Sequence, residues 1–185
     1  MDLKEKQNST VVYEFRNEVY PFPIFVGIGV SDKTIRDFFT RAKAPYGFEV
    51  GDNILRGKDA LTVPVIMWNY IGGKSVYKHG IFVNINANNA IDAGVITKEA
   101  CRVADWLCMK CGVRFGGKVE DGEAHAYLVG MAAQFIAYVV NHNVPPTVEK
   151  WTPAKLNRMC YEEFKDKIRR GEIKHDDNGN PIYPN

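Results

Sequence analysis

Two β-forming runs around a glycine pair constrain the fold of this chain more than any other feature. The first run, "LTVPVIMWNYI", ends at Ile71, and the second, "GIFVNIN", begins at Gly80. The pair Gly72 and Gly73 and the polar "KSVYKH" lie between them. Runs rich in β-branched and aromatic residues on either side of glycines are typical of a β-hairpin. Proline cannot donate a hydrogen bond to a neighbouring strand, so Pro64 predicts a strand at the sheet edge or with a bulge.

Shorter elements are expected before the hairpin. Apolar and β-branched residues predict strands at 11–15 and 24–28, separated by a proline-containing turn. Ser31 is expected to cap a helix whose apolar residues recur at helical spacing. The Gly27-x-Gly29 pair before this helix lacks the third glycine of the dinucleotide-binding motif. We therefore expect a tight strand-to-helix turn here and no nucleotide site.

Three helices are expected after the hairpin. Thr97 is expected to cap the first helix, and Gly112 to end it. The second, near residues 122–141, is apolar on almost every side and short for a membrane span, which predicts a central buried helix. Thr152 and Pro153 begin the third, which is amphipathic and charged. The element order predicts an α+β fold, with a small mixed or antiparallel sheet packed against two or three helices and a C-terminal helical extension.

A length of 185 residues favours a single domain with one sizeable core. We expect a flexible N-terminus over residues 1–10 and an α+β domain over residues 11–143. Residues 144–185 are expected to form a linker, the C-terminal helix and a turn-rich tail.

The charge balance and the N-terminal segment bear on the expected partners and the expected location of the protein. The 24 basic and 22 acidic residues leave a net charge of +2, so composition gives no general reason to expect nucleic-acid or membrane binding. The charged start "MDLKEKQNST" does not resemble a secretory signal, and we expect a cytoplasmic protein.

The four cysteines are expected to be reduced thiols. Cys101, Cys108 and Cys111 fall on one expected helix, and three residues of helix is a poor separation for a disulfide. The Cys108-x-x-Cys111 pair closes its helix, whereas a redox pair normally opens one. We expect at least two cysteines to be buried apolar residues. A metal site that uses Cys101, Cys108, Cys111 or His125 remains an alternative.

The segment "TKEACRVADWL" has the spacing of a zinc-peptidase helix but lacks its histidines. Such a helix holds zinc with two imidazoles four residues apart, and a glutamate after the first acts as general base. This chain has Lys98, Glu99 and Arg102 in those places, and Glu123 near the start of the next helix. A lysine ammonium and an arginine have no lone pair for a metal. We therefore expect no bound metal or other cofactor.

The element order and three segments resemble a group of small phage and prophage proteins with a zincin-like core. The resemblance covers roughly residues 11–140. In that family the corresponding helix usually begins with His-Glu-Ala-x-His, and the next helix carries Glu-x-x-Ala-Tyr-Leu. The segments that carry the resemblance here are "EVYPFPIFV", "KEACRVADWLCMKCG" and "DGEAHAYLVGMAAQFI".

The resemblance implies positions for a degenerate site. Lys98 and Arg102 stand where the two histidine ligands would be, Glu99 where the general base would be, and Glu123 where the third ligand would be. Tyr127, one turn further along, would face the same pocket. We hypothesise that an Arg102–Glu123 salt bridge occupies this vestigial metal site, and we assign no catalytic residue. The alternative without a functional role is a solvated, charged first turn of an ordinary amphipathic helix.

These replacements favour a non-catalytic accessory protein that acts in interaction or assembly with an unidentified protein partner. The competing enzyme hypothesis is a divergent metal-dependent hydrolase, with Glu99 as base and Glu123 plus cysteines or histidines as ligands. A third hypothesis is a structural subunit that oligomerises through the hairpin edge or the C-terminal helix.

Overall fold

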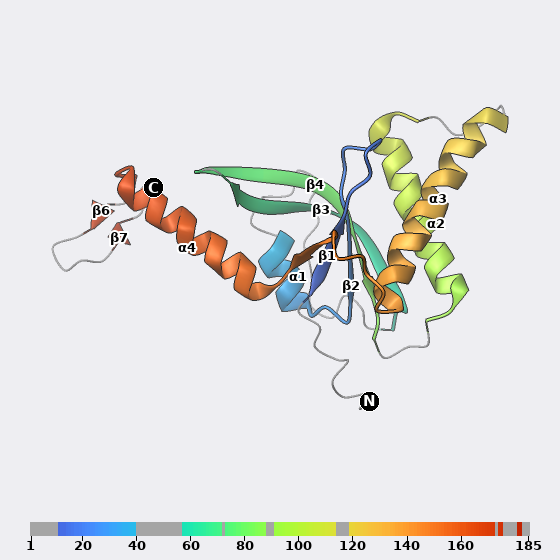
Figure 1. Ribbon diagram of the computed structural model, residues 1–185, viewed down its shortest axis with the longest axis horizontal. Coiled ribbons are helices and arrows are strands. Elements are labelled where there is room, and N and C mark those ends of the chain that lie inside the picture. The colour runs from blue at the N-terminus through green and yellow to red at the C-terminus, as the bar shows by residue number, and fades with distance from the viewer. Residues whose placement is uncertain are drawn as a thin grey trace.

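A five-stranded mixed β-sheet forms the centre of the molecule. The structure, a computed structural model, describes residues 11–39, 57–71, 73–87, 91–113, 119–172, 174–175 and 181–182. The expected flexible segment 1–10 lies outside these residues. The strand order is β3-β4-β2-β1-β5 (Figure 1). The strands are β1 (Val12–Phe15), β2 (Ile24–Ile28), β3 (Ala60–Ile71), β4 (Lys74–Ile85) and β5 (Glu149–Trp151).

The expected hairpin is present and is longer than its apolar runs. β3 and β4 pair antiparallel over their full lengths, so the polar "KSVYKH" belongs to a strand and not to the turn. β3 lies at the edge of the described sheet, which confirms the position inferred from Pro64. β4 also pairs parallel with β2, whereas β1 pairs antiparallel with β2 and β5.

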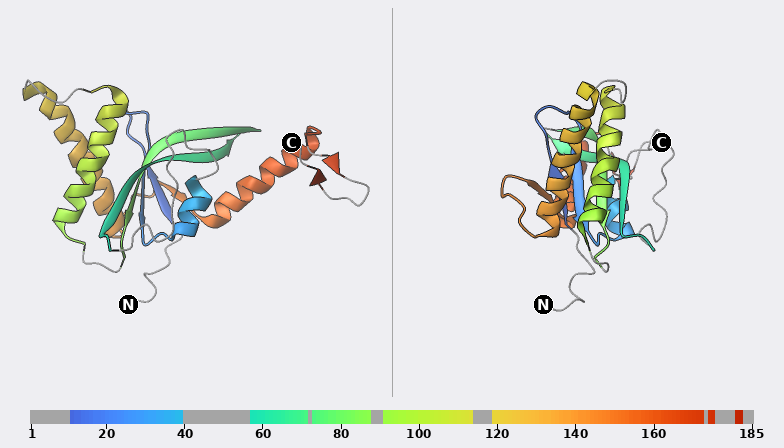
Figure 2. Two further views of the ribbon diagram at one scale, coloured as in Figure 1. Left: turned by 180° about the vertical axis from the view of Figure 1, so that it is seen from behind. Right: turned by 90° about the vertical axis from the view of Figure 1, so that its right-hand side faces the viewer.

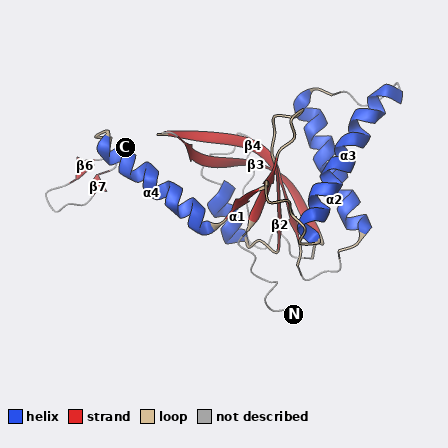
Figure 3. Cartoon of the chain, in the orientation of Figure 1, coloured by secondary structure: helices blue, strands red, loops and turns tan. Residues whose placement is uncertain are grey.

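Helices cover both faces of the sheet, and the α+β fold class is confirmed. Two helices, α2 and α3, lie on one side, and α1 and α4 lie on the other (Figures 1 and 2). Two short strands, β6 (Lys174–His175) and β7 (Pro181–Ile182), pair separately beyond α4 (Figure 3). The helices are α1 (Asp32–Phe39), α2 (Ala93–Cys111), α3 (Val119–Val140) and α4 (Pro153–Arg169).

Each face of the sheet has its own apolar cluster because side chains alternate along a strand. On β4, Ile81 and Val83 belong to the cluster beneath α2 and α3, whereas Phe82 belongs to the cluster beneath α1 and α4. On β2, Val26 and Phe25 divide in the same way. Strands buried on both faces explain why these segments read as nearly continuous apolar runs.

The turn between β2 and α1 is the tight turn that the glycine pair predicts. Gly29 has a φ of 58°, a left-handed conformation that glycine adopts without a steric penalty. A Cβ at Gly27 would lie 2.4 Å from Val30 Cγ2, so a side chain at this position would force the buried Val30 side chain to move. The buried Asn84 side chain accepts from Val30 N and donates to Val30 O, which fixes the turn against β4.

Helix α2 begins five residues earlier than expected. Asp92 is its N-cap, and the Asp92 carboxylate accepts a hydrogen bond from Val95 N at 2.8 Å. The Thr97 hydroxyl donates back to Ala93 O within the helix, so the expected cap at Thr97 is wrong. Both residue types favour capping positions, and the upstream aspartate occupies this one. The expected end at Gly112 is confirmed by its left-handed φ of 69°.

Helix α3 is an outer helix, and the expectation of a central buried helix is wrong. Leu128, Ala132 and Ile136 form part of its buried stripe, whereas Ala126 and Gly130 are exposed. These small residues raise the apolar content of the segment but lose little when they face water. No helix in the described part of the chain is long and apolar enough to cross a membrane.

The sheet continues past the boundary expected at residue 143. β5 pairs with β1, and the Trp151 side chain is buried in the cluster beneath α4. Leu156 and Met159 of α4 join the same cluster. Residues 144–151 therefore return the chain to the sheet and are not a simple linker. Thr152 caps α4 as expected, by accepting from Lys155 N.

Candidate functional site

Glu99, at the expected general-base position, is buried and held by two neighbours. Its residue exposure is 1%, and its side chain points from α2 toward β3. Thr62 Oγ1 donates to Glu99 Oε2 at 2.6 Å. Arg102 Nη1 donates to both carboxylate oxygens, at 2.8 and 3.0 Å. Both oxygens therefore accept hydrogen bonds from the protein itself.

Arg102 pairs with Glu99 and not with Glu123, so the expected salt bridge between α2 and α3 is wrong. The start of α3 instead lies beside the C-terminal half of α2, where His125 Nε2 is 3.1 Å from Asp105 Oδ1. Asp105 follows Lys98 by seven residues, which is roughly 10 Å along a helix. Lys98 and Glu123 are both exposed. Antiparallel packing of α2 on α3 thus separates Glu123 from the Glu99–Arg102 pair along the helix axes.

Tyr127 faces the loop between β1 and β2. Its hydroxyl oxygen lies 3.4 Å from Asn17 Nδ2, and the residue is 55% exposed. This contact does not link Tyr127 to Glu99. The structure therefore brings together Glu99 and Arg102 of the five expected residues, and it leaves Lys98, Glu123 and Tyr127 elsewhere on the two helices.

The cysteines are free thiols in different environments. Cys108 is buried, Cys101 and Cys160 are half-buried, and Cys111 is exposed at the last position of α2. Only Cys108 meets the expectation of full burial. Burial raises the pKa of the Cys108 thiol, and partial burial raises that of Cys111. Within the described ranges, no three histidine, cysteine, aspartate or glutamate residues form a group able to hold a metal ion.

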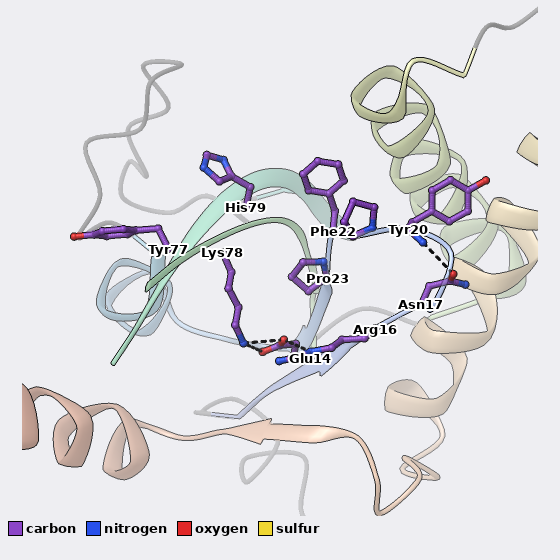
Figure 4. A pocket seen from close by; sticks show the side chains of 10 residues that line it. Glu14, Arg16, Asn17, Tyr20, Phe22, Pro23, Tyr77, Lys78 and His79 are labelled. Atoms are coloured by element: carbon purple, nitrogen blue, oxygen red, sulfur yellow. Dashed lines mark hydrogen bonds and ion pairs between the residues drawn. The ribbon is translucent and has the colours of Figure 1, made fainter. Parts of the chain in front are cut away.

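A second buried carboxylate, which the sequence reasoning missed, lies on β1. The Glu14 side chain has no exposed surface. Its Oε1 accepts from Arg16 Nε at 2.7 Å, its Oε2 accepts from Trp151 Nε1 at 2.9 Å, and Lys78 Nζ lies 3.2 and 3.3 Å from the two oxygens. Lys78 reaches the carboxylate from β4, and Arg16 reaches it from the position directly after β1 (Figure 4). One pattern in the sequence points to this site, because Glu14 shares a strand face with the apolar Val12.

A cavity of about 370 Å³ lies beside this cluster. It lies beside the start of β2. Ile24, the first residue of β2, pairs with Ile81, so residues 74–80 of β4 extend beyond β2. The proline-rich loop before β2 provides the opposite wall. The lining residues are Glu14, Arg16, Asn17, Tyr20, Pro21, Phe22, Pro23, Tyr77, Lys78 and His79.

Hydrogen bonds and aromatic packing hold this loop in place. Asn17 Oδ1 accepts from Val19 N at 2.6 Å and from Tyr20 N at 3.3 Å, which closes a local turn. Phe22 packs edge-on against Trp106 of α2, with ring centroids 5.4 Å apart. The "EVYPFPIFV" segment therefore links the cavity to the helical layer.

A second ion pair adjoins the cluster through Trp151. Lys155 Nζ lies 4.3 Å from the centre of the Trp151 ring and pairs with Glu149. The hydrogen bond from Lys155 holds the pKa of Glu149 below its ordinary value. Lys78 and Arg16 add a smaller electrostatic effect in the same direction. Cations from three separate parts of the chain thus lie around two carboxylates, Glu14 on β1 and Glu149 on β5.

Comparisons with known proteins do not place the chain in a family. No family model matches it, and neither the curated proteins nor the solved structures contain a significant match.

Proposed function

We propose that the chain is a non-catalytic accessory protein of the phage or prophage type, which acts through protein interaction or assembly in a bacterial cytoplasm. The observation that carries the non-catalytic part is the state of Glu99. This carboxylate is buried, and it accepts hydrogen bonds from Thr62 and Arg102. A general base must reach the proton that it removes, directly or through one water molecule.

The positions of the cations support the same proposal. Arg102 has no lone pair for a metal, and it forms an ion pair with Glu99, whose side chain is almost completely shielded from solvent. The hydrolase alternative needs Glu99 and Glu123 at one reaction centre, yet α3 begins beside the far half of α2. A structural role for Glu99 agrees with all of these contacts.

The hydrolase alternative can be tested with Glu99→Gln, which keeps the size of the side chain but removes its charge. The wild type and the variant are incubated with a mixed peptide library, with and without added zinc, and cleavage is followed by mass spectrometry. We expect no zinc-dependent cleavage by either protein. Zinc-dependent cleavage that Glu99→Gln abolishes in a folded protein would refute the non-catalytic proposal.

The interaction part needs a separate measurement. Tagged wild type and Glu99→Gln are cross-linked in bacterial cells, and the bound proteins are identified and quantified. We expect the same stoichiometric partner with both proteins, because Glu99 has no role in contacting it. The absence of any stoichiometric partner would contradict a role in interaction or assembly.

A further inference from the structure

We propose that the cavity beside Glu14 binds an acidic side chain of a protein partner, with Arg16 as the residue that recognises its carboxylate. This inference rests on the proposed function in that it takes the partner to be a protein. It adds a binding site and the chemistry of the ligand.

The first observation is the way in which Arg16 is held. Glu14 accepts from Arg16 through Nε alone, at 2.7 Å. The two terminal nitrogens of the guanidinium donate to no other described residue, and the side chain is 64% exposed. A guanidinium anchored at Nε keeps its outer donors in a fixed planar arrangement that suits two parallel hydrogen bonds to a carboxylate.

The second observation is the charge balance around the cavity. Arg16 and Lys78 face one carboxylate, Glu14, so the lining carries one net positive charge when His79 is neutral. The neighbouring Lys155–Glu149 pair leaves this balance unchanged. Because Glu14 is completely buried, a ligand at the cavity mouth meets the cations first. An anionic group is the complementary ligand.

The third observation is the size and composition of the cavity. A volume of about 370 Å³ accommodates a small group of atoms, such as one or two side chains. Pro21, Phe22 and Pro23 give it an apolar wall next to the cations. A nucleic acid is bound along an extended basic surface, whereas the lining of this cavity offers only two cations, Arg16 and Lys78, when His79 is neutral. These features favour an acidic residue with an apolar neighbour in the partner.

The probe is a fluorescein-labelled peptide of alternating glutamate and leucine, and the matched peptide carries glutamine in place of glutamate. Fluorescence anisotropy with the full chain measures the affinity of each at low ionic strength. We expect measurable binding of the glutamate peptide, at least about tenfold tighter than binding of the glutamine peptide. Equal affinity for the two peptides, or binding of neither, would overturn the proposal.

Two arginine variants separate the cavity from the general charge of the protein. Arg16→Gln removes the fixed donors, and Arg158→Gln removes the same charge from an exposed position on α4. We expect Arg16→Gln to weaken binding of the glutamate peptide about tenfold and Arg158→Gln to change it by less than about twofold. Circular dichroism confirms the fold of both. Equal losses, or a smaller loss for Arg16→Gln, would contradict the assigned site.

A single-stranded oligonucleotide and the cross-linked partner complete the test. Tighter binding of the oligonucleotide than of the glutamate peptide, lost in Arg16→Gln, would overturn the acidic-partner assignment. The cellular partner should be lost with Arg16→Gln and kept with Arg158→Gln. If both variants keep the partner, the cavity proposal fails and the proposed interaction function stands.

Discussion

Glu14 and Glu99 are both buried carboxylates, and exposed cations stabilise each of them. Arg16 is 64% exposed and Arg102 is 48% exposed, yet the guanidinium of each donates to a carboxylate with almost no exposed surface. A long arginine side chain can keep much of its surface in water while its donors reach inward. The cost of burying the carboxylate is thereby offset without burying a complete ion pair.

At the residue scale, Glu99→Ala should lower stability. The substitution leaves the Thr62 hydroxyl without its acceptor and Arg102 without its counter-ion. We expect a loss of about 1–3 kcal/mol in the free energy of unfolding, measured by urea denaturation. Glu162→Ala removes a carboxylate from an exposed pair with Arg158 and should cost less than about 1 kcal/mol. Equal losses would contradict a structural role for Glu99.

Glu149 provides a pH-dependent prediction. The hydrogen bond from Lys155 lowers the pKa of Glu149 below its ordinary value of 4.5 in the folded state. A lowered pKa stabilises the folded protein above pH 4.5, and this contribution disappears as the pH falls through the folded pKa. Lys155→Ala should therefore raise the pKa of Glu149 in an NMR titration. Lys165→Ala, whose lysine contacts Tyr161 further along α4, is the control that should leave this pKa unchanged.

At the scale of secondary structure, two residues that both favour helix caps lie near the start of α2, and only one of them caps it. Asp92 accepts from Val95 N, whereas Thr97 lies inside the helix. Asp92→Ala should reduce the free energy of unfolding by about 1 kcal/mol. Thr97→Ala should change it by less than about 0.5 kcal/mol, because alanine has the higher helix propensity. If urea denaturation shows a larger loss for Thr97→Ala than for Asp92→Ala, the assignment of Asp92 as the cap is wrong.

Helices and strands were predictable where one local pattern dominates, but the contacts between side chains of different elements were not. The long β-runs, Pro64 and the capping Thr152 each act within a few residues, and the structure confirms the elements that they predict. Whether Arg102 could reach Glu123 depended on how α3 is placed along α2. The spacing of residues within either helix does not predict that placement. Glu14 was recognisable as a charged residue on an apolar strand face, but its donors come from three separate parts of the chain.

At the scale of the whole molecule, the sheet is completed by residues distant in sequence. The hydrogen bond between Trp151 and Glu14 joins residues 137 positions apart. Composition and periodicity describe each segment separately, so they could not show that β5 would lie beside β1. Trp151 also supports the proposed binding site, because it helps to hold the carboxylate that positions Arg16.

Two truncations test whether the chain beyond residue 143 belongs to the folded unit. Removal of residues 144–185 deletes β5 and α4, and with them the buried Trp151 and Leu156. We expect the shortened chain to lose cooperative thermal unfolding, because the cluster beneath α4 opens to water and Glu14 loses a hydrogen-bond donor. Removal of residues 173–185 keeps both elements and should leave a cooperative transition. Calorimetry distinguishes the two, and cooperative unfolding of the chain that ends at residue 143 would contradict the role assigned to β5.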